Sequence, residues 1–211
     1  MAAYLEALIL YILLFFSGIR GAVITTQQSG SFSIYSEIIR ISLFFIPSIA
    51  LIWYLITRKW KLEYWIIRFG KKDLIGFIIT LPLLLITGIS VSLIASLTNA
   101  ENLITLPSPS GTAGWIILCI SCLFAAYMEE SFFRFYLISK REDLNLNAPA
   151  ALALSSALFA LCHIYEGPWG FLNAVFAGLI LGFMFLRFNS FHGIAIAHGT
   201  YNIIAFILSS L

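Results

Sequence analysis

Charged side chains are scarce in this sequence, where Asp, Glu, Lys and Arg together make up 10% of 211 residues. A soluble domain usually carries about 25%. Hydrophobic residues account for 61% of the chain, so the charged surface that water requires is missing. The composition therefore predicts an integral, multi-pass membrane protein.

The sequence also has no run of basic residues interleaved with aromatics, and its net charge is only +2. Nucleic-acid binding needs a concentrated basic surface, so we expect no nucleic-acid partner. The expected partners are the lipid bilayer and a membrane-associated peptide or protein.

Cysteine is rare, and small residues within the apolar runs are expected to serve packing. Cys119, Cys122 and Cys162 all lie in apolar segments, where a thiol usually packs as a small side chain. The Cys-x-x-Cys pair lacks the second ligand pair of a metal site and the strand-helix context of a redox motif. Gly178 and Gly182 form a small-x-x-x-small pair that predicts close approach of another helix within the same chain.

The first apolar run lacks the features of a cleaved signal peptide. It carries Glu6 in place of a basic leading region, and no clear small-residue cleavage site follows it. We therefore expect this helix to remain in the protein.

Seven apolar runs are each close to the length of about 20 residues that a helical crossing requires. They cover residues 5–24, 38–56, 74–97, 113–138, 148–164, 169–188 and 191–211. No internal repeat is evident, and little sequence is left for a soluble domain. We predict one all-α membrane domain over residues 1–211, a bundle of about seven transmembrane helices.

The distribution of basic residues predicts the orientation of this bundle. Basic residues concentrate at 58–72, at Lys140 and Arg141, and at Arg187, in loops that alternate helices place on one side of the membrane. The positive-inside rule makes that side cytoplasmic, which predicts an N-in, C-out topology with seven crossings. Residues 60–69 mix Trp and Tyr with basic residues, which fits either a segment in the headgroup layer or a basic loop with aromatic anchors.

Two carboxylates and a guanidinium stand within the run 113–138, at Glu129, Glu130 and Arg134. Charges at membrane depth are costly and are by default functional. Glu130 and Arg134 are four residues apart, so we expect a salt bridge along the helix. Glu129 is turned about 100° away from Glu130 and is left without that partner, which makes it the candidate base.

Polar residues recur at helical spacing in two later runs. Phe159 precedes His163 by four residues, so its ring is expected to hold the imidazole, and His198 and Asn202 are expected to point into the bundle from one helix face. A lone intramembrane histidine is commonly just hydrogen-bonded to a neighbouring helix. Two histidines, an asparagine and two glutamates on three helices favour a shared site instead, whereas His192, about 120° from the face of His198, is expected to be interfacial.

The depths of these groups test whether they can meet. At about 1.5 Å per residue, Glu129 lies roughly 15 Å from the cytoplasmic end of its run, His163 roughly 22 Å and His198 roughly 10 Å. We therefore expect convergence only if the fifth helix starts later, the seventh starts earlier, or the helices tilt.

The three motifs Glu-Glu-x-x-x-Arg, Phe-x-x-x-His and His-x-x-x-Asn, in this order on successive helices, resemble those of the C-a-a-X prenyl protease and bacteriocin-processing (CPBP, Abi-type) family of intramembrane proteases. The resemblance covers roughly residues 113–211, where it places the catalytic helices. It implies an endopeptidase in which Arg134 and Phe159 are supporting residues. The catalytic residues that it implies are Glu129, Glu130, His163, His198 and Asn202. Phe135 departs from the glycine of many members, and we expect its ring to narrow the space beside the site.

Two chemistries fit these residues. In one, Glu129 with His163 deprotonates a water that attacks a peptide carbonyl, and His198 with Asn202 stabilises the oxyanion. In the other, the histidines and a glutamate hold zinc, which activates the water. The family has been described in both ways. We favour the first, with no metal or other cofactor, because an amide is a natural oxyanion donor and no His-Glu-x-x-His pair is present.

Two other classes of protein also place such residues in a bundle. A proton-coupled transporter usually shows an inverted repeat with matched broken helices, which this short chain lacks. A catalytically silent scaffold would not need all four of Glu129, His163, His198 and Asn202. The compact chain is typical of a prokaryotic cell membrane, where prenylated tails are rare, so we expect a peptide or protein precursor as the substrate.

Overall fold

The computed structural model describes residues 2–25, 32–59, 68–98 and 108–210, with the exception of the side chains of residues 2, 16–25, 58 and 59. Every regular element within these residues is a helix. The prediction of an all-α bundle is therefore confirmed.

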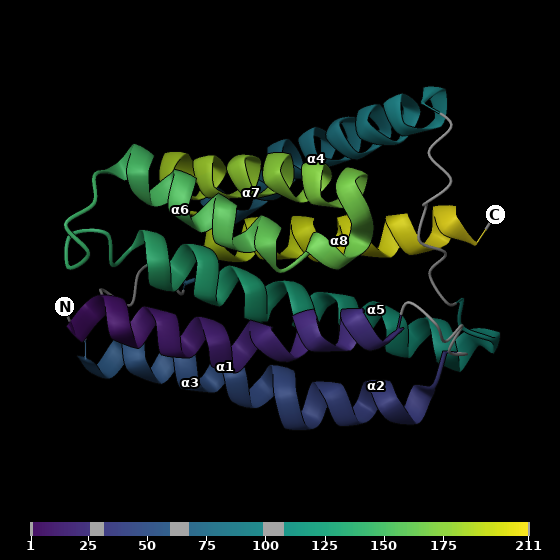
Figure 1. Cartoon of the computed structure of the whole chain (residues 1–211), viewed down its shortest axis with the longest axis horizontal. Coiled ribbons are helices and arrows are strands. Elements are labelled where there is room, and N and C mark those ends of the chain that lie inside the picture. The colour runs from purple at the N-terminus through teal and green to yellow at the C-terminus, as the bar shows by residue number, and fades with distance from the viewer. Residues whose placement is uncertain (1, 26–31, 60–67, 99–107, 211) are drawn as a thin grey trace.

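Seven helices correspond one to one with the seven apolar runs (Figure 1). The second of them is continuous but alternates α-helical and π-helical turns, and the fourth ends in a π-helical stretch. The bounds are α1 Ala2–Thr25; α2 Ile34–Arg40, η1 Ile41–Phe45, α3 Ile46–Tyr54 and η2 Leu55–Lys59; α4 Lys71–Leu97; α5 Gly111–Glu130 and η4 Ser131–Ile138; α6 Ala148–Leu161; α7 Gly167–Phe188; and α8 Phe191–Ser209.

Among the described residues, five helices are long and apolar enough to cross a membrane: Ile34–Thr57, Lys71–Leu97, Gly111–Ile138, Ile164–Phe188 and Phe191–Ser209. The predicted crossing at 148–164 differs. Helix α6 has 14 residues and spans about 21 Å, less than the roughly 30 Å of hydrocarbon in a bilayer.

The early end of α6 has a local cause. The chain leaves the α-helix at Cys162, makes a 3-10 turn (η5, Ile164–Glu166) and reaches Gly167 with a φ of 78°. Pro168 then occupies the first turn of α7, where its missing N–H costs nothing. The chain therefore turns at Gly167-Pro168, and His163 lies in a turn rather than in a helix.

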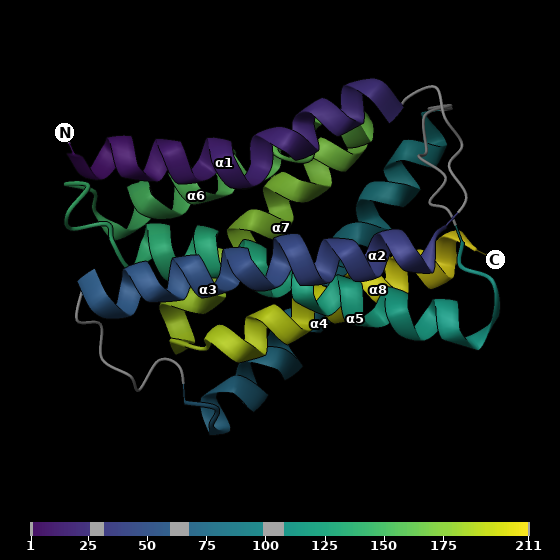
Figure 2. The same cartoon turned by 90° about the horizontal axis from the view of Figure 1, so that it is seen from below.

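Helix α5 lies between two groups of helices (Figure 1). Helices α1, α2 and α3 lie on one side of it, and α4, α6, α7 and α8 lie on the other. Helix α8 packs against α4 and α5, and α7 packs against α4 and α6. The ends marked N and C lie at opposite ends of the bundle, as both views show (Figures 1 and 2).

Glycines allow the helices that carry the motifs to approach closely. A Cβ on Gly178 would lie 3.1 Å from the Cα of Ser156, and Gly182 leaves equally little room against α6. Internal packing of this glycine pair, as predicted, is confirmed. A Cβ on Gly199 would lie 3.3 Å from the carbonyl oxygen of Cys122, so α8 lies against α5 directly beside His198.

A buried carboxylate fixes the N-terminal ends of α4 and α8 to each other. Asp73 is 1% exposed, and its Oδ1 accepts hydrogen bonds from Ser190 Oγ at 3.0 Å and Gly193 N at 3.2 Å. Its Oδ2 accepts one from Gly70 N at 2.9 Å. An anion near the N-terminal ends of two helices is also favourable to their dipoles, so Asp73 sets where α8 begins.

Most of the predicted interfacial segment, at 60–67, lies outside the described residues. The three cysteines are free thiols, and Cys122 and Cys162 are buried, as expected of packing residues.

Candidate active site

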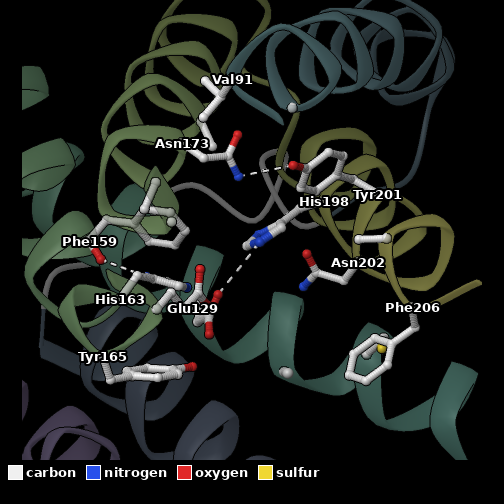
Figure 3. A pocket seen from close by; sticks show the side chains of 18 of the residues that line it. Val91, Glu129, Phe159, His163, Tyr165, Asn173, His198, Tyr201, Asn202 and Phe206 are labelled. Atoms are coloured by element: carbon white, nitrogen blue, oxygen red, sulfur yellow. Dashed lines mark hydrogen bonds and ion pairs between the residues drawn. The ribbon is translucent and has the colours of Figure 1, made fainter. Parts of the chain in front are cut away.

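The imidazole of His198 lies between the two adjacent carboxylates of α5. Its Nδ1 is 2.9 Å from Glu130 Oε1. Its Nε2 is 3.7 Å from Glu129 Oε2, and Figure 3 shows these two side chains facing each other. Consecutive residues of a helix point about 100° apart, and α8 places the ring where it meets both side chains. A carboxylate accepts hydrogen bonds, so the proton of this bond is on Nδ1.

Glu130 and Arg134 form the predicted salt bridge, which is confirmed at 2.9 Å between Arg134 Nη1 and Glu130 Oε1. Both side chains are 0% exposed. Arg134 Nη2 also donates to the carbonyl of Gly178 at 3.1 Å, and its guanidinium lies 4.6 Å from the ring centre of Phe159. The guanidinium therefore connects Glu130 to α6 and α7.

The helix changes from α to π geometry immediately after Glu130. Such stretches are uncommon and occur frequently at functional sites. Ser131, the first π-helical residue, accepts a hydrogen bond from Trp53 Nε1 at 2.9 Å, which anchors the change of geometry to α3.

His163 enters the site from the turn after α6. Its Nδ1 is 2.8 Å from the carbonyl oxygen of Phe159, and the two ring centres are 4.5 Å apart. The predicted packing of Phe159 on His163 is confirmed. Because a carbonyl only accepts, Nδ1 carries the proton, and Nε2 of the neutral ring is an acceptor.

The motifs meet although α6 begins at Ala148 and α8 at Phe191, as the sequence predicted. Neither shift of a helix start is needed. The relative placement of the helices brings the three groups together (Figures 1 and 3).

Asn202 lies one turn after His198 on α8, and its amide points toward Glu129 (Figure 3). Tyr201 precedes it, and its hydroxyl accepts a hydrogen bond from Asn173 Nδ2 at 3.0 Å. Within the described part of the chain the Asn202 amide makes no hydrogen bond, so its donors are available to a ligand.

A cavity of about 490 Å³ adjoins these groups, a size typical of ligand sites. Glu129, His163, His198 and Asn202 line it, whereas Glu130 and Arg134 do not. Its other lining residues come from the second helix and from α4, α5, α6, η5, α7 and α8: Arg40, Phe45, Gly88, Val91, Ser92, Ala95, Leu118, Ser121, Cys122, Ala125, Phe159, Tyr165, Glu166, Trp169, Gly170, Asn173, Ala174, Ala177, Tyr201, Ala205 and Phe206.

Sequence reasoning missed several polar residues of this cavity. The predicted site did not include Arg40, Tyr165, Glu166, Asn173 or Tyr201. The signal for Asn173 was present, because an amide within an apolar run is expensive in a membrane. The others could not be distinguished from interfacial residues.

Two predictions about neighbouring residues have different outcomes. Phe135 was expected to narrow the site, but it does not line the cavity; its ring centre lies 6.1 Å from that of Trp53 and 5.2 Å from that of Phe191. His192 was placed outside the site, and it is within 3.1 Å of the Tyr127 hydroxyl, away from the cavity lining.

A zinc ion at this site would need at least three protein ligands around one point. Nδ1 of each histidine is already hydrogen-bonded, which leaves the two Nε2 atoms and Glu129 as ligands. In the part of the chain that the structure describes, no three His, Cys, Asp or Glu side chains are grouped closely enough to hold a metal. The present arrangement therefore does not fit a zinc site, and the chemistry below is derived from the side chains themselves.

The family model of the type II CAAX prenyl endopeptidase Rce1-like proteins matches residues 111–204. No curated protein and no solved structure matches the chain. The matched residues run from the start of α5 into α8 and contain all three motifs, which confirms the resemblance found in the sequence. The family is one of proteases, and five described helices are long and apolar enough to cross a membrane, as an integral membrane protein requires. Over residues 111–204, the chain is similar to the Rce1-like family of type II CAAX prenyl endopeptidases.

Proposed function

We propose that this chain is an intramembrane endopeptidase that cleaves a membrane-associated peptide or protein with a water activated by Glu129. The observation that supports this best is the position of His198 between two carboxylates, beside a cavity that His163 and Asn202 also line. A base, a second proton acceptor and two oxyanion donors are thereby available to one ligand.

Glu129 and His163 act on the water in this proposal. Glu129 Oε2 is buried and has no hydrogen-bond partner among the described residues, as expected of an acceptor that waits for a water or a substrate. His163 Nε2 orients the same water. Glu129 takes one proton as the water oxygen bonds to the peptide carbonyl carbon, and returns it to the amine nitrogen as the C–N bond breaks.

His198 and Asn202 stabilise the oxyanion. The Asn202 amide donates one hydrogen bond, and His198 Nε2 donates the second. Because Nδ1 already carries a proton, this role requires a doubly protonated ring, and the carboxylates of Glu129 and Glu130 on its two sides compensate the charge.

Glu130 belongs to the predicted catalytic set, and its geometry supports a positioning role within it. It holds His198 Nδ1 and Arg134 but does not line the cavity. Its carboxylate therefore acts on the substrate through the orientation and charge of His198.

We further propose a precursor peptide or protein as the substrate and a prokaryotic cell membrane as the location. The cavity supports a peptide substrate because small side chains line much of it, including Gly88, Ala95, Ala125 and Ala174, and leave space for a main chain.

The test uses the purified full-length chain in detergent and a pool of lipidated, fluorescently labelled peptides, with cleavage sites read by mass spectrometry. We expect the wild-type protein to cleave and Glu129→Gln to be inactive. Glu142→Gln is the matched control, because Glu142 is 89% exposed and outside the cavity. Binding without cleavage would indicate a scaffold, and proton flux in liposomes without cleavage would indicate a transporter.

A further inference from the structure

One positively charged side chain in the cavity wall, that of Arg40, has no part in the proposed chemistry. Arg40 is the only Lys or Arg among the described residues that line the cavity. Its Nη2 is 2.7 Å from Glu37 Oε2 and 3.4 Å from Ser121 Oγ on α5, and the Ser121 hydroxyl also donates to Glu37. The Arg40 side chain is 53% exposed and that of Glu37 only 13%, so the cation is the accessible member of the pair.

The guanidinium of Arg40 retains donors for a ligand. The contacts with Glu37 and Ser121 use Nη2 alone, and no contact among the described residues occupies Nη1 or Nε. The group also lies 5.4 Å from the ring centre of Phe45, which favours one orientation through a cation-π contact. The free Nη1 of this guanidinium can donate a charge-assisted hydrogen bond to a carboxylate.

The distance from Arg40 to the proposed base is set by α5. Ser121, Ala125 and Glu129 are four residues apart, and all three line the cavity. At 1.5 Å per residue, Ser121 and Glu129 are separated by about 12 Å along the helix. An extended peptide covers roughly 3.3–3.6 Å per residue, so three or four residues span this distance.

The other charged residues of the cavity make its two ends different for a negatively charged group. Glu129 and Glu166 are the acidic residues that line it, and they repel a carboxylate from the end where the peptide bond would be cleaved. Arg40 attracts it at the other end through its opposite charge. A negatively charged group on a bound peptide is therefore held away from Glu129 and beside Arg40.

We propose that Arg40 is a specificity-determining residue that binds a carboxylate of the substrate, three or four residues from the bond that Glu129 attacks. The carboxylate is supplied either by the C-terminus of the substrate or by an Asp or Glu side chain. This inference rests on the proposed function and adds to it the chemical group that selects the substrate.

The test uses the peptide pool described above in four versions. One has a free C-terminal carboxylate three residues after the most frequent cleavage site, and the second has the corresponding amide. The third and fourth carry the amide together with Asp or Asn at that third position. We expect KM to be about tenfold lower, or more, for the free acid than for the amide, or for Asp than for Asn, because each neutral version loses a charge-assisted hydrogen bond. The comparison that shows the effect identifies the source of the carboxylate.

Point variants distinguish recognition of the substrate by Arg40 from a purely structural role of the Arg40–Glu37 ion pair. Arg40→Gln should raise KM for the preferred acid about tenfold without changing kcat, and should abolish the preference over the neutral version. Glu37→Gln should leave this KM unchanged or lower it, because it removes a competing carboxylate. Arg141→Gln is the control, since Arg141 lies outside the cavity. Equal losses in Arg40→Gln and Glu37→Gln on all four peptides would instead indicate a purely structural pair and overturn the proposal.

The failure of this inference is distinguishable from failure of the proposed function. If the wild-type protein cleaves acid and neutral versions equally well, the role of Arg40 is refuted and the endopeptidase stands. If it cleaves none of the peptides, the proposed function fails. Fluorescence anisotropy with the Glu129→Gln variant then decides the role of Arg40 by itself: tighter binding of the acid, lost in Glu129→Gln/Arg40→Gln, supports it, and equal binding overturns it.

Discussion

Replacing Glu130 by Gln removes the charge that the buried Arg134 guanidinium faces, while it keeps the size of the side chain. Both side chains are completely buried, and the guanidinium also bonds the Gly178 carbonyl. Breaking a buried ion pair by removing one partner typically costs about 3–5 kcal/mol, because the remaining charge is left uncompensated. At roughly 2–4 °C per kcal/mol for a chain of this size, we expect Tm to fall by about 6–20 °C.

The buried thiols of Cys122 and Cys162 supply the assay. A thiol-reactive dye that becomes fluorescent on conjugation reports their exposure as the detergent-solubilised protein is heated. Glu142→Gln should leave Tm unchanged, since Glu142 is solvent-exposed. The double variant Glu130→Gln/Arg134→Met should recover much of the loss, because it removes the stranded charge together with its partner.

Activity should decrease in Glu130→Gln as well, because His198 Nδ1 loses its charged acceptor. Loss of activity with an unchanged Tm would refute the reasoning. That result would show that the Glu130–Arg134 pair adds no stability and would place Glu130 in the chemistry itself.

The remaining predictions concern the base, the oxyanion donors, the metal and the position of α8. Glu129→Gln should reduce turnover to below a few per cent with Tm preserved, and higher residual turnover would exclude Glu129 as the base. Asn202→Ala should lower kcat about a hundredfold with KM nearly unchanged, whereas a rise in KM alone would indicate a binding role. Chelators should leave activity intact and elemental analysis should find substoichiometric zinc; activity lost on chelation and restored by zinc would make His163 and His198 ligands instead. Asp73→Ala should lower Tm by several degrees relative to the exposed control Asp143→Ala, because two buried donors and one half-buried donor lose their acceptor. Equal Tm values would contradict its role in fixing α8.

Local features of the site were predictable from the sequence. Glu130 and Arg134 are four residues apart in one continuous helix, and Phe159 and His163 are four residues apart across the end of α6. Pairs this close in sequence meet whatever surrounds them. The seven helices were predictable for a related reason, since an apolar run of sufficient length satisfies its backbone polar groups only as a helix in a membrane. The orientation of the bundle relative to the membrane stays a prediction.

The end of α6 is a feature that the hydropathy pattern predicted wrongly. Residues 148–164 read as one apolar run because Leu161, Cys162 and Ile164 continue it on both sides of His163, so the run gave no sign that the helix stops at Leu161. The glycine and proline that redirect the chain come four and five residues after His163. Hydropathy therefore predicted a crossing where the structure has a turn within the site.

Contacts between helices were decided by the tertiary structure alone. His198 meets Glu129 and Glu130 across about 70 residues of sequence, and Arg40 meets Ser121 across 81. The sequence by itself determined which side chains are too polar for the membrane and must find partners. Which partners they find depends on how α8 and α2 pack on α5. Glycines, Asp73 and the shape of each interface decide this packing together, because no pattern within one helix specifies the rotation or depth of its neighbour.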